Sequence, residues 1–320
     1  MAVWKSIQDS HSGFCYDLSQ SLAIVDWRHS VLEPVRDSSM VLVSDYSGQH
    51  KGSSHEAYSF LVTTMRAIHE WLPAREAFRR EWLKDGRRIS FKQLGDSIRW
   101  RAFAPFLGLA SALRGNLITI LVDRRIKSFV EGRVSSLVEI MPDCFSANTS
   151  PKTMEKMLRL ASFVAMITAD LRNEHQPSSW ISDHDETLET FDRREQLGRL
   201  ACYFTFAFAG WREPADMWYG TTEASDLPSW AEDAAAIPDL IAGAACKLAF
   251  VLPTHCGTEL WTRTVSTAGV HDRRARIVGD WLAARPGHLR QILLRLELSS
   301  DGQPRASAQF FAGATRVMHG

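Results

Sequence analysis

The sequence predicts an α/β fold in which a mixed sheet is flanked by helices. Two apolar, β-rich runs joined by a polar loop stand near the start of the chain, and helical and strand patterns alternate after them. The chain has 320 residues, of which 45% are hydrophobic. A chain of this size and composition can bury a substantial core, so a folded protein is expected rather than a disordered one.

The first two strands are predicted as a hairpin. Residues 1–39 come before them and are weakly periodic, so we expect an N-terminal appendage. The runs MVLVSD (residues 40–45) and AYSFLVTT (residues 57–64) are short and rich in β-branched and aromatic residues. Glycines and serines fill the segment between them, which is typical of a loop that turns the chain back.

Helical and strand patterns then alternate as far as residue 182. Apolar residues at helical spacing predict helices, β-branched and aliphatic runs predict strands, and one segment is extended or a strand. In chain order these are a helix over 65–83, the extended segment RRISFKQLGD over 87–96, a helix over 97–113, the strand GNLITILVDRR over 115–125, an amphipathic helix over 152–174 and the strand SSWIS over 178–182.

The second half contains one strongly buried element. Residues 234–252 are apolar nearly all round, which predicts a helix packed against the sheet. We expect residues 40–252 to form the core domain and residues 253–320 to be a C-terminal extension packed on it. The other predicted segments are a charged helix over 186–204, an irregular stretch over 210–230, a basic, helix-like piece over 272–296 and a short strand over 306–313.

Composition and charge exclude some classes of protein. Lysine and arginine together number 37, as do aspartate and glutamate, so net charge neither indicates nor excludes a polyanionic partner. The five cysteines are widely spaced and include no C-x-x-C pair, which argues against a disulfide scaffold or a structural zinc site. No secretory leader or run of about 18 apolar residues is present, so a cytoplasmic protein with no membrane partner is expected.

Three aspartates stand where such a core would bring side chains together. Asp45 ends the first predicted strand, Asp183 follows SSWIS, and Asp239 lies in the first turn expected for the buried helix, after Pro238. Magnesium and similar cations prefer carboxylate, water and phosphate oxygens, and two such ions can assist phosphodiester cleavage. The aspartates are therefore candidate ligands for Mg²⁺ or Mn²⁺ and candidate catalytic residues.

Each of these residues also has a structural interpretation. An aspartate after a strand commonly forms a turn, and one in the first turn of a helix commonly caps it. In SDHDE (residues 182–186), Asp185 is a further candidate metal ligand beside Asp183 and Glu186, but a charged loop leading into a helix explains the same residues. Asp123, in VDRR, is predicted to pair with a following arginine.

Basic residues add candidates for phosphate contact. Lys92, in the otherwise apolar ISFKQL, is a candidate substrate-binding residue, and an exposed strand lysine is the alternative. Two basic stretches, residues 75–88 and 272–295, could follow a phosphate backbone. Acidic residues are interspersed in both, which favours solvated helix faces. The chain contains neither a nucleophile elbow nor a glycine-rich phosphate loop.

Taken together, these segments resemble the RNase H-like family called domain of unknown function 3800. In that family the first strand carries D-E-S-G, an E-x-K segment follows, a hydrophobic strand ends near V-D-K, and a late helix begins with Q-x-A-D-x-I-A-G. The matching segments lie in the same order between residues 40 and 252, namely VLVSDYSG, FLVTT, ISFKQL, ITILVDRR, the strand that ends at Asp183, and IPDLIAGA.

The resemblance implies roles and also shows departures. It implies an RNase H-like sheet in which Asp45, Asp183 and Asp239 bind metal, and it aligns Lys92 with the lysine of E-x-K. Three residues depart from the family pattern. Tyr46 and Ser90 stand where the family has glutamates, and Pro238 stands where it has alanine. If Ser90 aligns, one acidic group is missing, which leaves either a three-aspartate site completed by Asp185 or Glu186, or a decayed site.

Two functions follow from the residues and the resemblance. The first is a metal-dependent nuclease that uses Mg²⁺ or Mn²⁺ and water to cleave nucleic acid. The resemblance implies a prokaryotic defence system, including antiviral defence, or a mobile-element system. The alternative is a non-catalytic RNase H-like module that binds nucleic acid or a protein partner in a multi-component complex. The chain has 11 tryptophans, many between residues 211 and 281, which are compatible with an interface although buried core tryptophans are commoner.

Overall fold

The computed structural model of the chain describes most of its length. The described residues are 3–8, 13–50, 52–130, 134–146, 148–184, 190–211, 216–224, 227–249, 262–263, 270–284 and 287–311.

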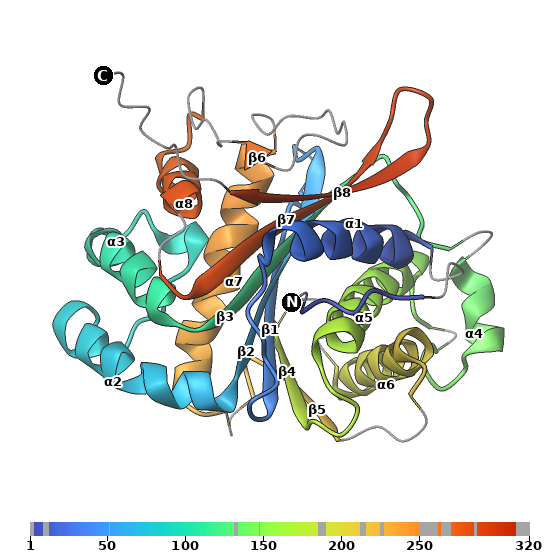
Figure 1. The fold of residues 1–320 in the computed structure, drawn as a ribbon, viewed down its shortest axis with the longest axis horizontal. Coiled ribbons are helices and arrows are strands. Elements are labelled where there is room, and N and C mark those ends of the chain that lie inside the picture. The colour runs from blue at the N-terminus through green and yellow to red at the C-terminus, as the bar shows by residue number, and fades with distance from the viewer. Residues whose placement is uncertain are drawn as a thin grey trace.

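The protein has an α/β fold, as predicted, built on one mixed sheet (Figure 1). The strand order is β5-β4-β1-β2-β3-β7-β8-β6, and the last strand has only two residues. The strands are β1 (Met40–Ser47), β2 (His55–Thr64), β3 (Gly115–Asp123), β4 (Ser178–Ser182), β5 (Met217–Thr221), β6 (Thr262–Arg263), β7 (Leu289–Leu298) and β8 (Pro304–Phe311).

Strand directions divide the sheet into three parts. Strands β1, β2 and β3 form an antiparallel meander, which confirms the predicted hairpin. On the β1 side, β4 runs parallel to β1 and β5 parallel to β4. On the other side, β7 runs parallel to β3, and β8 returns antiparallel to β7. Strand β1 is therefore central, with partners on both sides.

Helices cover both faces of the sheet (Figure 1). The described residues form eight α-helices and two 3₁₀ turns. Helix α7 lies across β1 and β2, in a layer with α2, α3 and α8, and α1, α5 and α6 lie on the opposite face. The helices are α1 (Phe14–His29), α2 (Met65–Trp82), α3 (Ser97–Ala112), α4 (Leu137–Ile140), α5 (Pro151–Leu171), α6 (Phe191–Ala209), α7 (Trp230–Leu248) and α8 (Arg273–Ala284), and the 3₁₀ turns are η2 (Phe91–Gln93) and η3 (Val134–Ser136).

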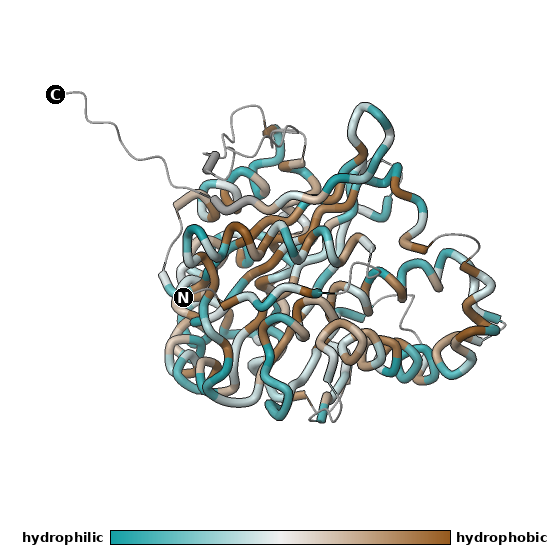
Figure 2. Tube along the Cα trace, turned by 45° about the vertical axis from the view of Figure 1, so that its right-hand side comes forward, coloured by the Kyte–Doolittle hydropathy of each residue, from teal (hydrophilic) through white to brown (hydrophobic). Residues whose placement is uncertain are grey.

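The alternation of side chains along each strand produces two hydrophobic cores. In β1, Val41 and Val43 pack into the core under α7, whereas Met40 and Leu42 pack into the core under α1 and α5. The central strands are therefore apolar along most of their length, as the hydropathy colouring in Figure 2 shows. Because Asp45 follows the same alternation as Val43, it faces the α7 layer.

Three segments differ from the sequence prediction. Residues 87–96, predicted to be extended or a strand, contain the 3₁₀ turn η2. The stretch over 210–230, predicted to be irregular, contains β5. The basic piece over 272–296 divides into α8 and β7. Strand β7 is paired on both sides and largely buried, and a short apolar run of this kind has no periodicity that separates strand from helix.

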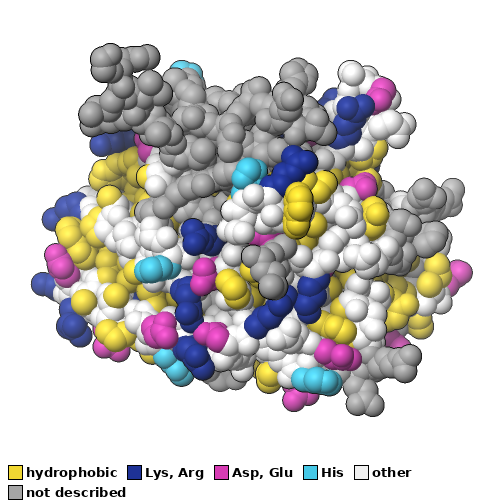
Figure 3. All heavy atoms as spheres, viewed as in Figure 1, with side chains coloured by type: hydrophobic (Ala, Val, Ile, Leu, Met, Phe, Trp, Pro, Cys, Tyr) yellow, Lys and Arg dark blue, Asp and Glu magenta, His cyan; other side chains and the backbone are white. Residues whose placement is uncertain are grey.

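The surface charges and the cysteines do not indicate a particular function. Basic and acidic side chains are interspersed on the face shown in Figure 3, in agreement with the net charge of zero. In the part of the chain that the structure describes, no helix is long and apolar enough to cross a membrane. Cys15, Cys144, Cys202 and Cys246 are free thiols, and Cys256 lies outside the described residues.

Candidate functional site

The three predicted aspartates line one pocket. This acidic pocket has a volume of about 210 Å³ and lies at one edge of the α7 layer. Asp45 comes from β1, Asp183 from the residue after β4, and Asp239 from α7. The loop that contains η2 closes another side and contributes Ser90 and Lys92. Segments up to 194 residues apart in the sequence therefore meet here.

Asp45 lies at the floor of the acidic pocket. It pairs with Ser59 of β2 inside the sheet, and its side chain is only 8% exposed. Burial raises the pKa of Asp45 well above its ordinary value, and the charges of Asp239 and Asp183 raise it further. The Tyr46 backbone and Lys92 lower this pKa by smaller amounts. The carboxyl group is thus held where a negative charge is costly.

Asp183 reaches the pocket because β4 runs parallel to β1. The backbone N–H of Asp183 donates a hydrogen bond of 2.9 Å to the Ser44 carbonyl, which continues the ladder by one residue. The Thr222 hydroxyl donates to Asp183 Oδ1 at 3.4 Å. Parallel strands end at the same edge of a sheet, so Asp183 is delivered beside Asp45.

Asp239 does not occupy the first turn of its helix. Helix α7 begins at Trp230, so the prediction that Asp239 follows a helix start at Pro238 was wrong. The first turn instead contains Glu232 and Asp233, and Pro238 lies inside the helix. Acidic residues favour the positive end of a helix dipole, which explains the earlier start. Asp239 is therefore in mid-helix, and its side chain has no capping role there.

The η2 loop binds the Asp239 carboxylate. The Phe91 N–H donates to Asp239 Oδ2 at 2.6 Å, and the Ser90 side chain makes a second hydrogen bond to this carboxylate. Burial raises the pKa of Asp239 to about 6, against the lowering effect of these two bonds. Sequence reasoning treated Ser90 only as a missing glutamate. In the structure it is a partner of Asp239.

A glycine allows the η2 loop to approach α7 closely. A Cβ atom at Gly243 would lie 2.5 Å from two ring atoms of Phe91, whose side chain is only 6% exposed. Only glycine fits this approach without a shift of the ring. Gly243 lies one helical turn after Asp239, so the same contact that packs Phe91 also brings its N–H to the carboxylate.

Lys92 and the remaining predicted residues have different positions. Lys92 is exposed at the pocket and lies in η2, not in a strand. Asp123 ends β3, and its carboxylate pairs with Arg125 at 2.5 Å, as predicted. Asp185 and Glu186 lie outside the described residues. Their predicted contribution to the site remains a prediction.

Another buried aspartate, Asp233, connects α2 to α7. The Asp233 side chain is fully buried and accepts hydrogen bonds from Arg75 Nε at 2.6 Å and Arg79 Nε at 2.9 Å. Both arginines belong to α2, in the first basic stretch that the sequence offered for phosphate contact. They tie α2 to the first turn of α7, so these two residues serve packing.

The donor set suits a hard divalent cation in its chemistry. The charges of Asp183 and Asp239 raise the pKa of Asp45, and the charge of Asp183 also raises the pKa of Asp239, and a bound cation would relieve this repulsion. Within the described residues, however, no three His, Cys, Asp or Glu side chains are placed to hold a metal ion together. Magnesium is commonly held by one or two carboxylates with water and substrate phosphate. Asp45 with one neighbouring aspartate meets that smaller requirement.

Comparisons with known proteins add no relative. No family model matches the chain, and no curated protein matches it.

Proposed function

We propose that the protein is a metal-dependent hydrolase that cleaves phosphodiester bonds in nucleic acid. The observation that carries this proposal is the convergence of Asp45, Asp183 and Asp239 on one pocket. Burying several carboxylates together at the end of a sheet costs free energy, and such clusters are typical of sites that bind cations or transfer protons. The negative charges of Asp183 and Asp239 raise the pKa of Asp45, and this repulsion would favour the binding of a cation.

The sheet supports the finer fold assignment that belongs with this function. An antiparallel β1-β2-β3 meander, extended on the β1 side by parallel β4 and β5, is the arrangement expected of an RNase H-like sheet. The first-strand aspartate then lies in the middle of the sheet, next to the end of β4. Strands β7 and β8 add to the β3 side and leave this arrangement unchanged.

The residues divide the proposed chemistry among them. Asp45, Asp183 and Asp239 would hold Mg²⁺ or Mn²⁺, which supplies charge neutralisation and an activated water when bound. Lys92, which is exposed at the rim, would pair with a phosphate oxygen of the substrate. Ser90 and the Phe91 N–H orient the Asp239 carboxylate and fix its direction toward the pocket.

A second candidate is a non-catalytic module of the same fold that binds nucleic acid or a protein. Its support is the absence, within the described residues, of three acidic or cysteine or histidine side chains placed to hold one ion. The occupied Asp239 carboxylate adds to this support, because two donors already use part of its lone-pair capacity.

Calorimetric titration with Mg²⁺ and Mn²⁺ tests the proposal, together with cleavage assays on single- and double-stranded DNA, RNA and hybrid. We expect the wild type to bind metal and cleave at least one polymer, and Asp239→Asn to lose both. Asp301→Asn, the same change at the exposed β7–β8 turn, should behave as wild type. A folded wild type that neither binds metal nor cleaves would reject the enzyme and favour the binding module.

A further inference from the structure

A basic pocket lies between α2 and the first turn of α7, in the same helical layer as the acidic pocket. It has a volume of about 750 Å³. The charged side chains that line it are Arg75, Arg79, Arg80, Lys84 and Glu232. Even when the buried Asp233 behind them is counted, positive charge exceeds negative charge among these described residues.

The four cations differ in what they already bind. Arg75 and Arg79 hold Asp233, and most of their N–H groups are used there or in bonds to neighbouring backbone and serine oxygens. Arg80 is 73% exposed and pairs only loosely with Glu76, at 4.0 Å. Lys84 is also exposed. An exposed pair of this kind contributes little, so Arg80 and Lys84 can both turn toward a phosphate.

The basic pocket adjoins the acidic pocket at two places. Thr222 lines the basic pocket, and its hydroxyl donates to Asp183 Oδ1 at 3.4 Å. Arg79 Nη1 donates to the Arg87 carbonyl at 2.8 Å, and the next residue, Arg88, lines the acidic pocket. The two pockets therefore share a wall, and a chain molecule in one can continue into the other.

Helix α7 forms one side of both pockets. Glu232 lines the basic pocket, whereas Ala235, Ala236 and Asp239 line the acidic pocket. Residues three and four apart lie on the same face of a helix. The basic pocket is thus displaced from the acidic pocket along a single face of α7, toward the start of that helix.

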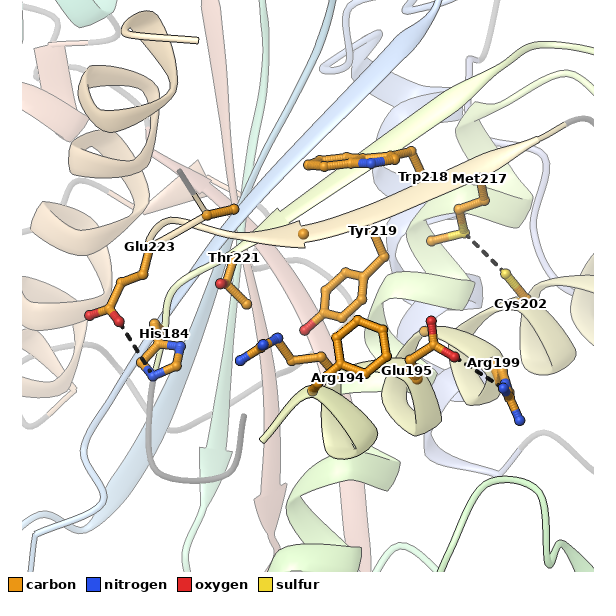
Figure 4. A pocket seen from close by; sticks show the side chains of 14 residues that line it. His184, Arg194, Glu195, Arg199, Cys202, Met217, Trp218, Tyr219, Thr221 and Glu223 are labelled. Atoms are coloured by element: carbon orange, nitrogen blue, oxygen red, sulfur yellow. Dashed lines mark hydrogen bonds and ion pairs between the residues drawn. The ribbon is translucent and has the colours of Figure 1, made fainter. Parts of the chain in front are cut away.

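A larger pocket on the other side of the sheet lacks the excess of positive charge. It lies between β5 and α6, which belongs to the opposite helical layer, and has a volume of about 860 Å³. Figure 4 shows that it contains Arg194 and Arg199 together with Glu195 and Glu223, and Arg199 pairs with Glu195 at 3.0 Å. Attraction of a polyanion requires more positive than negative charge, which distinguishes the basic pocket from this one.

We infer that the basic pocket binds the phosphate backbone of the nucleic acid that the acidic pocket cleaves, through Arg80 and Lys84. The inference rests on the proposed function, since it places the substrate of that reaction. A polymer is specified because the cations and the carboxylates lie in different pockets, so a ligand that reaches both needs more than one phosphate. Phosphate contacts carry no sequence information, so binding here is independent of base sequence.

Fluorescence anisotropy tests this inference without any need for catalysis. The probes are labelled DNA and RNA oligonucleotides, single-stranded and duplex, and EDTA is present throughout. We expect the double variant Arg80→Ala with Lys84→Ala to weaken binding about tenfold or more at about 100 mM salt. The plot of log affinity against log salt concentration should become shallower by about 1.5, because each phosphate contact contributes about 0.7–0.9 to its slope.

Two further variants separate a local effect from a general one. Arg199→Ala is the matched control, because it also removes an exposed helix arginine whose partner is a glutamate four residues earlier, but in the opposite layer. It should leave the affinity and the slope unchanged. Glu232→Gln removes the negative charge from the basic pocket and should strengthen binding, a gain that partial unfolding could not produce.

The outcomes distinguish this inference from the proposed function. An unchanged slope in the double variant, an equal loss in Arg199→Ala, or no binding of any oligonucleotide by the wild type would overturn the inference. Metal-dependent hydrolysis of bis(p-nitrophenyl) phosphate by the wild type, a substrate with no polymer backbone, would then still support the proposed function. Conversely, binding that depends on Arg80 and Lys84 in a protein that hydrolyses no phosphodiester would support the basic pocket and reject the enzyme.

Discussion

At the residue scale, the buried carboxyl groups of the acidic pocket lower the free energy of unfolding at neutral pH. Asp45 and Asp239 both have raised pKa values, mainly because their carboxyl groups are withdrawn from water. A folded state that binds protons more tightly than the unfolded state is most stable at low pH. The stability that Asp239 contributes is fully present below about pH 4 and is lost as the pH rises through about 6.

Replacing Asp239 should therefore stabilise the metal-free protein at neutral pH. Asp239→Asn keeps an oxygen to accept the Phe91 N–H but removes the buried charge. We expect its free energy of unfolding to exceed that of the wild type by about 3 kcal/mol at pH 8, and the difference to fall below about 1 kcal/mol near pH 4. Urea denaturation in EDTA at the two pH values measures this. A difference that is the same at both would contradict the proposed origin.

Sequence position predicted which aspartates would meet but not what they would contact. Asp45 and Asp183 follow apolar strand patterns, and strand ends are where such side chains gather. The hydrogen bonds from Ser90 and Phe91 to Asp239 could not be predicted, because residues 87–96 read as extended and their packing on α7 depends on tertiary contact. The sequence pattern predicts where an aspartate stands in a strand or helix, whereas its hydrogen-bond partners depend on how distant segments pack together.

At the element scale, the position of η2 against α7 depends on Gly243. Gly243→Ala would place a Cβ atom into the buried Phe91 ring, and the displaced loop would release Asp239. We expect a loss of about 1–3 kcal/mol in the free energy of unfolding, as for other overpacked sites, together with weaker metal binding. Chemical denaturation and calorimetry measure the two effects.

Gly108→Ala is the matched control for that substitution. Gly108 also lies inside a helix, α3, but nothing lies within 4 Å of a Cβ atom placed there. Alanine has the better helix propensity, so this variant should be more stable by about 0.5–1 kcal/mol. If both alanine variants were more stable than the wild type, the prediction that a Cβ atom at position 243 destabilises the fold by contact with Phe91 would be wrong.

Helices were easier to predict than the later strands for a physical reason. Helices α2, α3 and α5 carry long amphipathic or apolar patterns over 16 to 21 residues, and their predicted bounds agree closely with the structure. Strand β5 has five residues, with an exposed Trp218 and a glycine that reads as a loop signal. Its place in the sheet comes from pairing with β4, which no local pattern records.

At the scale of the whole molecule, the sheet joins the predicted C-terminal extension to the core. Strand β7 pairs with β3 over eight residues, and Leu293 packs in the same core as α7. We expect Leu293→Ala to lower the free energy of unfolding by about 2–5 kcal/mol, as for other buried leucines. Tryptophan fluorescence and far-ultraviolet circular dichroism should show one shared transition. Separate transitions would indicate that residues 253–320 fold as an independent unit.

The β3–β7 pairing also has a consequence for biosynthesis. Gly115 pairs with Leu289, so the neighbouring strands β3 and β7 are 174 residues apart in the chain. A ribosome adds about 5–20 residues per second, so the hydrogen-bonding edge of β3 would wait roughly ten seconds or longer for its partner. During that interval an apolar strand edge is open to other chains. Aggregation during translation should therefore depend on how quickly the last fifth of the polypeptide leaves the ribosome.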